Sequence, residues 1–156
     1  MKIHLIEVCD KTPSWAEEGF SEYQKRIPKE FKFQLHQVKP GKRSGESNLK
    51  KIMFDEGRRM ISLIPKNAIV IKLEIEGQQW ATKNLSSNLQ NWMNNGRDIA
   101  FLVGGPEGLP SECKKISSIS WSLSALTLPH SLVKIFIAEQ IYRAWSILTN
   151  HPYHRK

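Results

Sequence analysis

The sequence contains few of the features that mark secreted, membrane-spanning or metal-binding proteins. Only two of its 156 residues are cysteines, Cys9 and Cys113, and neither belongs to a CxxC pair or to a metal-ligand spacing. We therefore expect buried or half-buried structural thiols, no disulfide and no metal site. No apolar run reaches the roughly 18 residues of a membrane-spanning helix, and the N-terminus lacks a signal-peptide cleavage site. These absences predict a cytoplasmic protein with no membrane partner.

Two phosphate-binding motifs are absent as well. The chain has no GxxxxGK[ST] stretch, and no GxGxxG follows the first predicted strand. A phosphate-cradling P-loop and an ordinary dinucleotide-binding fold are therefore disfavoured, and so is a nucleotide hydrolase. A nucleoside-like ligand without phosphates stays compatible with the sequence.

Acidic residues are in deficit. Lysine and arginine number 23 against 15 aspartates and glutamates, which gives a net charge of +8. This excess favours a polyanion as partner, because phosphate contacts dominate the affinity for nucleic acids. Solvated surface charge is the alternative for each basic side chain. The candidate RNA contacts form two segments: Lys25, Arg26 and Lys29 at the end of the first predicted helix, and Lys39, Lys42 and Arg43 in a polar loop.

Strand and helix patterns alternate along the whole chain. Strands are predicted at 2–9, 31–35, 68–75, 99–103 and 119–124, and helices at 13–27, 49–64, 83–95, 110–116 and 131–149. This alternation predicts an α/β fold with a parallel sheet and helices on both faces. Because the sequence shows no linker and no repeat, we expect residues 1–156 to form one domain.

Local signals predict where the helices begin, end and face the core. Thr12, Ser47 and Thr82 are expected N-caps, and Gly96 is the expected C-terminal stop of its helix. The first helix is expected to bury Trp15 on the same face as its other apolar side chains. The last helix is apolar on much of its circumference and needs cover on more than one side. The sheet can provide one side, and a second subunit could provide the other.

The segment FLVGGPEGL, residues 101–109, ends a predicted strand in three glycines and a proline. Ligands of open α/β sheets lie beyond the carboxyl ends of the strands. Glycine leaves no Cβ between such a ligand and the main-chain amides. The segment is therefore either a ligand-binding loop or a tight turn without a ligand. Glu107 is expected to hold the loop through hydrogen bonds to backbone amides.

The segment SWSLSALTLPH, residues 120–130, is too short for a helix and too apolar for an exposed loop. We expect it to be buried, and its main-chain groups then need hydrogen-bond partners. The edge of an adenine ring is one such partner, and protein or water is the alternative. His130 is expected to cap the last helix or to pack at its start.

Four stretches together resemble the RlmH family, which are small SPOUT-class methyltransferases that modify ribosomal RNA of the large subunit. The stretches are LVGGPEGL, SWSLSALTLPH, AEQIYRAWSILTNHPYHR and IVIKLEIEG, and the resemblance covers essentially the whole chain. It implies a SPOUT fold with a C-terminal trefoil knot over about residues 100–156, a homodimer, and S-adenosylmethionine as cofactor without a metal. The implied cofactor-binding residues are Leu73, Gly104, Leu123, Ser124, Ala125, Leu126, Thr127 and Leu128.

The resemblance also implies the reaction, which is methylation of N3 of pseudouridine 1915 in 23S rRNA, within the large subunit or the whole ribosome. The tail of the partner subunit is implied to supply three catalytic candidates. His154 is a base or an orienting group, Arg155 contacts a phosphate or a base carbonyl, and Tyr153 stacks on a base. A solvated tail is the alternative, with water or phosphate accepting the proton. The rival function is a non-catalytic, basic RNA-binding dimer on the same fold.

Overall fold

The computed structural model describes residues 1–43 and 48–155 and contains one five-stranded parallel sheet. The strand order is β2-β1-β4-β3-β5, and every neighbouring pair is parallel. The strands are β1 (Ile3–Val8), β2 (Gln34–Val38), β3 (Ile69–Gln79), β4 (Ile99–Val103) and β5 (Ile119–Ser122). The predicted α/β fold with a parallel sheet is confirmed.

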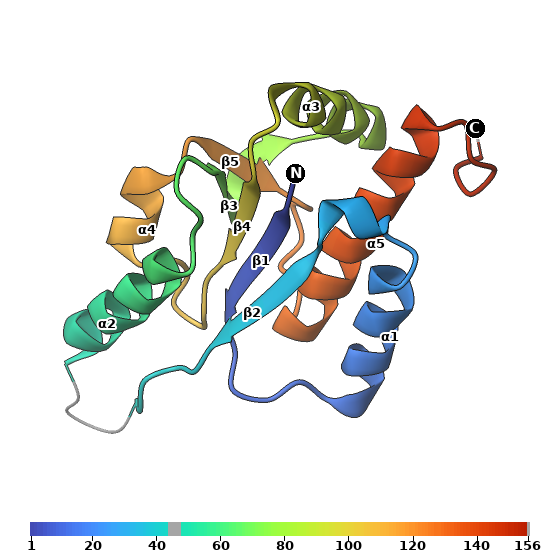
Figure 1. Cartoon of the computed structure of the whole chain (residues 1–156). Coiled ribbons are helices and arrows are strands. Elements are labelled where there is room, and N and C mark those ends of the chain that lie inside the picture. The colour runs from blue at the N-terminus through green and yellow to red at the C-terminus, as the bar shows by residue number, and fades with distance from the viewer. Residues whose placement is uncertain (44–47, 156) are drawn as a thin grey trace.

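Helices cover both faces of this sheet (Figure 1). Helices α1 (Ser14–Gln24), α3 (Thr82–Asn95) and α5 (His130–Leu148) lie on one face, and α2 (Leu49–Ser62) and α4 (Ser111–Ile116) lie on the other. A short 3-10 helix (Lys29–Phe31) precedes β2. The central strand β4 is buried on both faces, so its sequence, IAFLV, is a continuous apolar run rather than an alternating one.

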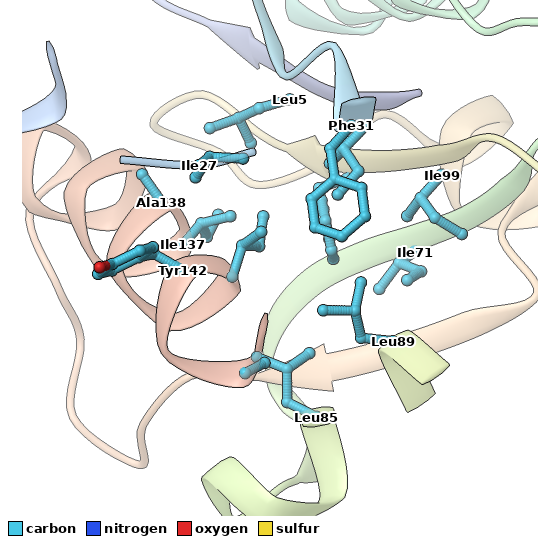
Figure 2. Packing of buried hydrophobic residues seen from close by; sticks show 14 of the residues in the cluster. Leu5, Ile27, Phe31, Ile71, Leu85, Leu89, Ile99, Ile137, Ala138 and Tyr142 are labelled. Carbon is cyan, nitrogen blue, oxygen red and sulfur yellow. The ribbon is translucent and has the colours of Figure 1, made fainter. Parts of the chain in front are cut away.

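Two cores follow from this layering, because successive strand side chains point to opposite faces. Leu5 belongs to the core beneath α1, α3 and α5, and its neighbour Ile6 belongs to the core beneath α2 and α4. Figure 2 shows part of the larger core, to which Ile71 of β3, Leu89 of α3 and Ile137 of α5 belong. Cys113 is buried in the smaller core and Cys9 is half-buried; both thiols are free, as predicted.

The long apolar helix α5 is covered mainly by its own chain. It packs on the sheet and against α1 on one side and α3 on the other. Most of the cover beyond the sheet therefore comes from α1 and α3, so the wide apolar surface of α5 does not by itself require a second subunit. Phe136 is an exception, with 45% of its surface exposed. In the part of the chain that the structure describes, no helix is long and apolar enough to cross a membrane.

Several predicted helix ends differ from the observed ones. Pro13 and Ala81 occupy the N-cap positions assigned to Thr12 and Thr82. The Thr12 hydroxyl instead accepts a hydrogen bond from Lys134, at 2.8 Å. Ser47 lies outside the described residues, and the cap of α2 is the Asn48 side chain. Gly96, with φ of 62°, ends α3 as predicted.

Trp15 is 53% exposed, so its predicted burial is wrong. It precedes the buried Phe20 by five residues, which places the two side chains about 140° apart around the helix. A spacing of three or four residues is needed to share a face.

Strand β3 is longer than predicted and contains an irregularity. It continues through residues 76–79, which were expected to be a loop, and its register with β5 shifts between Leu73 and Gln78. Trp121 is paired with both of these residues. Gly77 lies against β5 at this point, where a Cβ would approach the Trp121 carbonyl carbon to 2.7 Å. Residues 74–77 therefore bulge from the sheet at its carboxyl edge.

Candidate functional site

A cavity of about 460 Å³ opens at the carboxyl edge of the sheet, beyond β4. Its walls are the glycine loop, which we define as residues 104–109, and the leucine loop, which we define as residues 123–128. The bulge of β3 and the start of α5 complete the lining. Seven of the eight residues implied as cofactor-binding line this cavity; Ala125 does not. They are Leu73, Gly104, Leu123, Ser124, Leu126, Thr127 and Leu128.

The glycine loop is a tight turn that also lines the cavity, so the two interpretations of its sequence are compatible. The Gly108 amide donates to the Gly105 carbonyl at 3.0 Å, and Gly108 has a φ of +83°. A Cβ at Gly104 would lie 2.3 Å from the Gly108 carbonyl carbon. The loop folds back on its own backbone there, so glycine at 104 is required by the turn itself.

One arginine anchors the glycine loop to the rest of the protein. Arg43 donates to both oxygens of Glu56, at 2.6 and 2.8 Å, and to Glu107 at 2.9 Å. Glu107 therefore holds the loop chiefly through Arg43, and the expected backbone hydrogen bond is limited to the one at Glu107 itself. Arg43 is not a free surface cation, contrary to its expected role in RNA contact, because the buried Glu56 carboxylate needs a positive partner.

The pKa values of this cluster follow from its geometry. Burial on its own raises the pKa of Glu56, but hydrogen bonds from Arg43 and the Gly41 amide outweigh burial and hold it below its usual 4.5. Hydrogen bonds from Arg43 also lower the pKa of Glu107. Both carboxylates are charged at neutral pH, and the bidentate guanidinium fork fixes their positions.

The leucine loop is much less enclosed than expected. Leu126 is 73% exposed, and Ala125 and Thr127 are exposed as well. Two serines satisfy part of the backbone: the Ser122 hydroxyl donates to the Ser124 carbonyl at 3.0 Å, and the Leu126 amide donates to the Ser124 hydroxyl at 2.9 Å. The predicted burial of this loop is wrong, because the rest of the chain covers only the inner side of the loop.

The β3 bulge forms a third wall that the sequence analysis missed. It brings Glu74, Ile75 and Glu76 to the cavity. The Glu74 carboxylate accepts from Lys72 at 2.7 Å and from the Ser120 hydroxyl at 2.8 Å, and Lys114 lies 3.9 Å away. Two glutamates directly after an apolar strand were the available signal, but only the register shift shows that they face the cavity.

A buried polar network supports the start of α5 beneath the cavity. Lys134 and Glu7 are both almost fully buried, and their Nζ and Oε1 atoms are 2.5 Å apart. Gln37 also donates to Glu7, at 2.8 Å. His130 lines the cavity, and its Nε2 lies 2.7 Å from the Val8 carbonyl oxygen, which confirms that it packs at the helix start. The sequence analysis missed the network, which ties α5 to the carboxyl end of β1.

The C-terminal tail lies far from the cavity of its own chain. It follows the last turn of α5, whereas the cavity lies at the first turn, and the 19 residues of this helix span about 28 Å. The Tyr153 hydroxyl donates to Glu139 at 3.0 Å, and the Arg143 guanidinium lies over the Tyr153 ring. The structure therefore brings neither Tyr153 nor its neighbours His154 and Arg155 to the residues that line the cavity.

Burial, together with hydrogen bonds to Tyr23 and Glu139, raises the pKa of Tyr153. Its phenol is therefore neutral at physiological pH and acts here as a donor. Glu139 and Arg143 form an i,i+4 ion pair, with a shortest distance of 2.5 Å. The Nδ1 atom of His154 is buried and has no hydrogen-bond partner among the described residues.

Comparisons with known proteins agree with this arrangement. The family model described as a predicted SPOUT methyltransferase matches residues 1–154. The ribosomal RNA large subunit methyltransferase H of Methylococcus capsulatus is 45% identical over 155 residues, which cover 99% of this chain and all of that protein. The chain belongs to the RlmH family of SPOUT methyltransferases. SPOUT methyltransferases generally use S-adenosylmethionine as methyl donor.

Two solved structures share the fold of this RlmH-family chain at low sequence identity. A probable methylase family protein from Haemophilus influenzae has a TM-score of 0.58 at 12% identity; the match covers 99% of this chain and 70% of the other. A putative methylase family protein from Neisseria gonorrhoeae has a TM-score of 0.51 at 9% identity. This match covers 97% of this chain and 95% of the other. At these identities the likeness concerns the fold alone.

Proposed function

We propose that this protein methylates N3 of pseudouridine 1915 in 23S rRNA, with S-adenosylmethionine as methyl donor. The observation that carries the proposal is the cavity between the glycine and leucine loops, in a chain 45% identical to a ribosomal RNA large subunit methyltransferase. Because the target belongs to ribosomal RNA, we also propose a cytoplasmic location and a substrate that is the assembled large subunit or the ribosome.

The lining of the cavity fits S-adenosylmethionine. Its volume is within the usual range of about 300–1,000 Å³ for small-molecule sites. Leucines and main-chain groups of the two loops can hold an adenosine, and the carboxylates of Glu74 and Glu76 suit a donor with positive charge. Lys114 is the single lysine or arginine among these lining residues. A triphosphate in the same place would meet two carboxylates and one ammonium group.

The reaction needs alignment more than it needs acid or base strength. S-adenosylmethionine supplies a methyl group that is already activated by a positively charged sulfur. N3 of pseudouridine lies between two carbonyls and becomes nucleophilic when its proton leaves. Holding the reacting groups in line is worth about 7–11 kcal/mol in favourable cases. The glycine loop, held by Arg43, and the start of α5, held by Lys134, give the cavity two fixed walls for this purpose.

We propose that the tail acts on a second copy of the chain. Because it lies at the far end of α5 from the cavity of its own chain, a catalytic tail requires a homodimer. In that arrangement His154 accepts or orients the N3 proton, Arg155 contacts a phosphate or a base carbonyl, and Tyr153 contacts a base. The trefoil knot over about residues 100–156 is part of the same proposal, as is a reaction without a metal.

The test is methyl transfer to ribosomes from a strain that lacks this protein. We expect the full-length enzyme to restore N3-methylpseudouridine, detected by mass spectrometry of the ribosomal RNA. A chain ending at residue 150 is expected to bind S-adenosylmethionine in calorimetry but to transfer no methyl group. If this truncated chain methylates ribosomes at the full rate, the role of the tail is wrong.

Mixed dimers test the second copy. A tail-less subunit combined with a Gly105→Val subunit has one intact cavity and one intact tail, on different chains. We expect this mixture to regain activity that neither variant has alone. The rival function, a non-catalytic RNA-binding dimer, predicts no calorimetric signal with S-adenosylmethionine or S-adenosylhomocysteine.

A further inference from the structure

A second hollow, of about 710 Å³, lies beside the candidate cofactor cavity. It is formed by the first half of α2 and the end of the glycine loop with the start of α4, and we call it the α2–α4 groove. Leu109 and Lys114 line both this groove and the cavity. A chain molecule whose reacting unit enters the cavity can therefore continue into the groove.

The groove carries positive charge. Lys50, Lys51 and Lys114 line it, against the single carboxylate of Glu112 among its lining residues. Lys50 and Lys51 belong to the first turn of α2, which has no acidic residue. The helix dipole is positive at that end, so lysines there raise the free energy of the helix. An anion bound between them would lower it.

An aromatic side chain lies in the same groove. Phe54 follows Lys50 by four residues, which places both on one face of α2. The Phe54 side chain is 48% exposed and lines the groove. Exposed aromatic rings beside lysines are the usual means of holding single-stranded nucleic acid, because bases stack on the ring while ammonium groups bind phosphates.

We propose that the α2–α4 groove binds the RNA strand next to the nucleotide that enters the cavity. Lys50, Lys51 and Lys114 bind its phosphates, and Phe54 stacks on one of its bases. The proposal rests on the proposed function, because it takes RNA as the substrate. Arg43, the expected contact in the neighbouring loop, is occupied by Glu56 and Glu107 and has no part in it.

The test compares two double variants with the same change in charge. Lys50→Glu/Lys51→Glu alters the groove, and Lys66→Glu/Lys83→Glu alters two exposed lysines elsewhere on the surface. Binding to ribosomes from the deletion strain is measured across a salt series, and S-adenosylmethionine binding is measured by calorimetry. We expect the groove variant to bind ribosomes at least about tenfold more weakly. Its plot of log affinity against log salt should be shallower by about 1.4, which corresponds to two lost single-strand phosphate contacts.

The control variant is expected to stay within about twofold of the parent protein, and both variants should bind S-adenosylmethionine normally. Phe54→Leu should weaken ribosome binding without changing the salt slope, because stacking releases no counterions. If the groove variant folds poorly, Lys50→Gln/Lys51→Gln replaces it, with the same expected signs. Equal losses in the groove and control variants, or no loss in the groove variant, would overturn the proposal.

The outcome separates this proposal from the proposed function. If the parent protein binds ribosomes through the groove but transfers no methyl group, the proposed methyltransferase function is refuted and the groove proposal stands. If the parent protein methylates ribosomes and the groove variant does so with the same rate and the same affinity, the groove proposal is refuted and the proposed function stands. Weaker ribosome binding with an unchanged salt slope indicates a ribosomal protein as partner and also refutes it.

Discussion

The two loops that face each other across the cavity differ in how their own chain holds them. The glycine loop folds against its own backbone at Gly104 and is fixed by Arg43, which also pairs with the buried Glu56. The leucine loop is held by hydrogen bonds of Ser124, within the loop, and Ser122, just before it. Its Leu126 side chain is largely exposed. One wall is preformed, and the other presents apolar surface that the chain itself leaves uncovered.

This difference has an energetic consequence. Substitutions in a preformed wall should act on the folded state, because they break interactions that exist without a ligand. Substitutions in an uncovered wall should act on binding, because the apolar surface is removed from water only when a ligand or a second subunit covers it. Measurements of stability and cofactor affinity in the same variants test this contrast.

The largest effect is expected at Arg43. Arg43→Met leaves the Glu56 carboxylate buried without its cation, and loss of one partner of a buried pair costs about 3–5 kcal/mol. Chemical denaturation gives the change in the free energy of unfolding. The double variant Arg43→Met/Glu56→Leu should recover most of the loss, because no uncompensated charge is left. If the single and double variants are equally unstable, the ion pair is not the cause.

The next effect concerns two neighbouring glycines. Gly104→Ala would place a methyl group 2.3 Å from the Gly108 carbonyl carbon, whereas Gly105→Ala would lie 3.3 Å from a Val8 methyl carbon. Backbone cannot move aside as readily as a side chain, so we expect a loss of about 3 kcal/mol for Gly104→Ala and under about 1 kcal/mol for Gly105→Ala. Thermal unfolding and calorimetry with S-adenosylmethionine measure both. Equal behaviour of the two variants would contradict the described turn.

A smaller effect, and one of a different kind, is expected in the leucine loop. Leu126→Ser should change the free energy of unfolding by no more than about 0.5 kcal/mol, because the side chain is already exposed. It should weaken S-adenosylmethionine binding about tenfold, which is about 1.4 kcal/mol. Leu63→Ser, at another exposed leucine, is the matched control and should leave affinity unchanged. A large loss of stability in Leu126→Ser would show that the apo protein already covers this loop.

The smallest effect is a dependence of stability on pH. The pKa values of Glu56 and Glu107 are lowered in the folded protein, so their pairs with Arg43 contribute stability above the ordinary value of 4.5. This contribution is lost as the pH falls through the lowered values. Denaturation at neutral pH and at about pH 3 should show a smaller loss in Arg43→Met/Glu56→Leu than in the parent protein. An identical pH dependence would mean that these carboxylates do not contribute.

Much of the fold was predictable because its signals are local. The strand at 99–103 and the stop at Gly96 follow from a few adjacent residues, and the structure confirms both. Errors arose where a local pattern gave no information on position around a helix or along a strand. Trp15 was assigned to the same helical face as Phe20, although a spacing of five residues places their side chains about 140° apart. The last residues of β3 are polar, and pairing with β5 makes them a strand.

The candidate site was predictable as two segments and not as an arrangement. The glycine and leucine loops stand out in the sequence because each contradicts the ordinary composition of a turn or a loop. The residues that anchor them do not stand out. Arg43 is 64 residues from Glu107, and Lys134 is 127 residues from Glu7. No spacing rule connects such pairs.

The sequence by itself determined the order of strands and helices, the absence of the two common phosphate-binding motifs, and the two unusual loops. It did so because backbone propensity and apolar periodicity act over a few residues. Only the tertiary structure decided which charged side chains would be neutralised in the interior and which would line a groove. That choice depends on which strand ends and helix ends meet, and the burial of Glu7 and Glu56 then required Lys134 and Arg43 as partners.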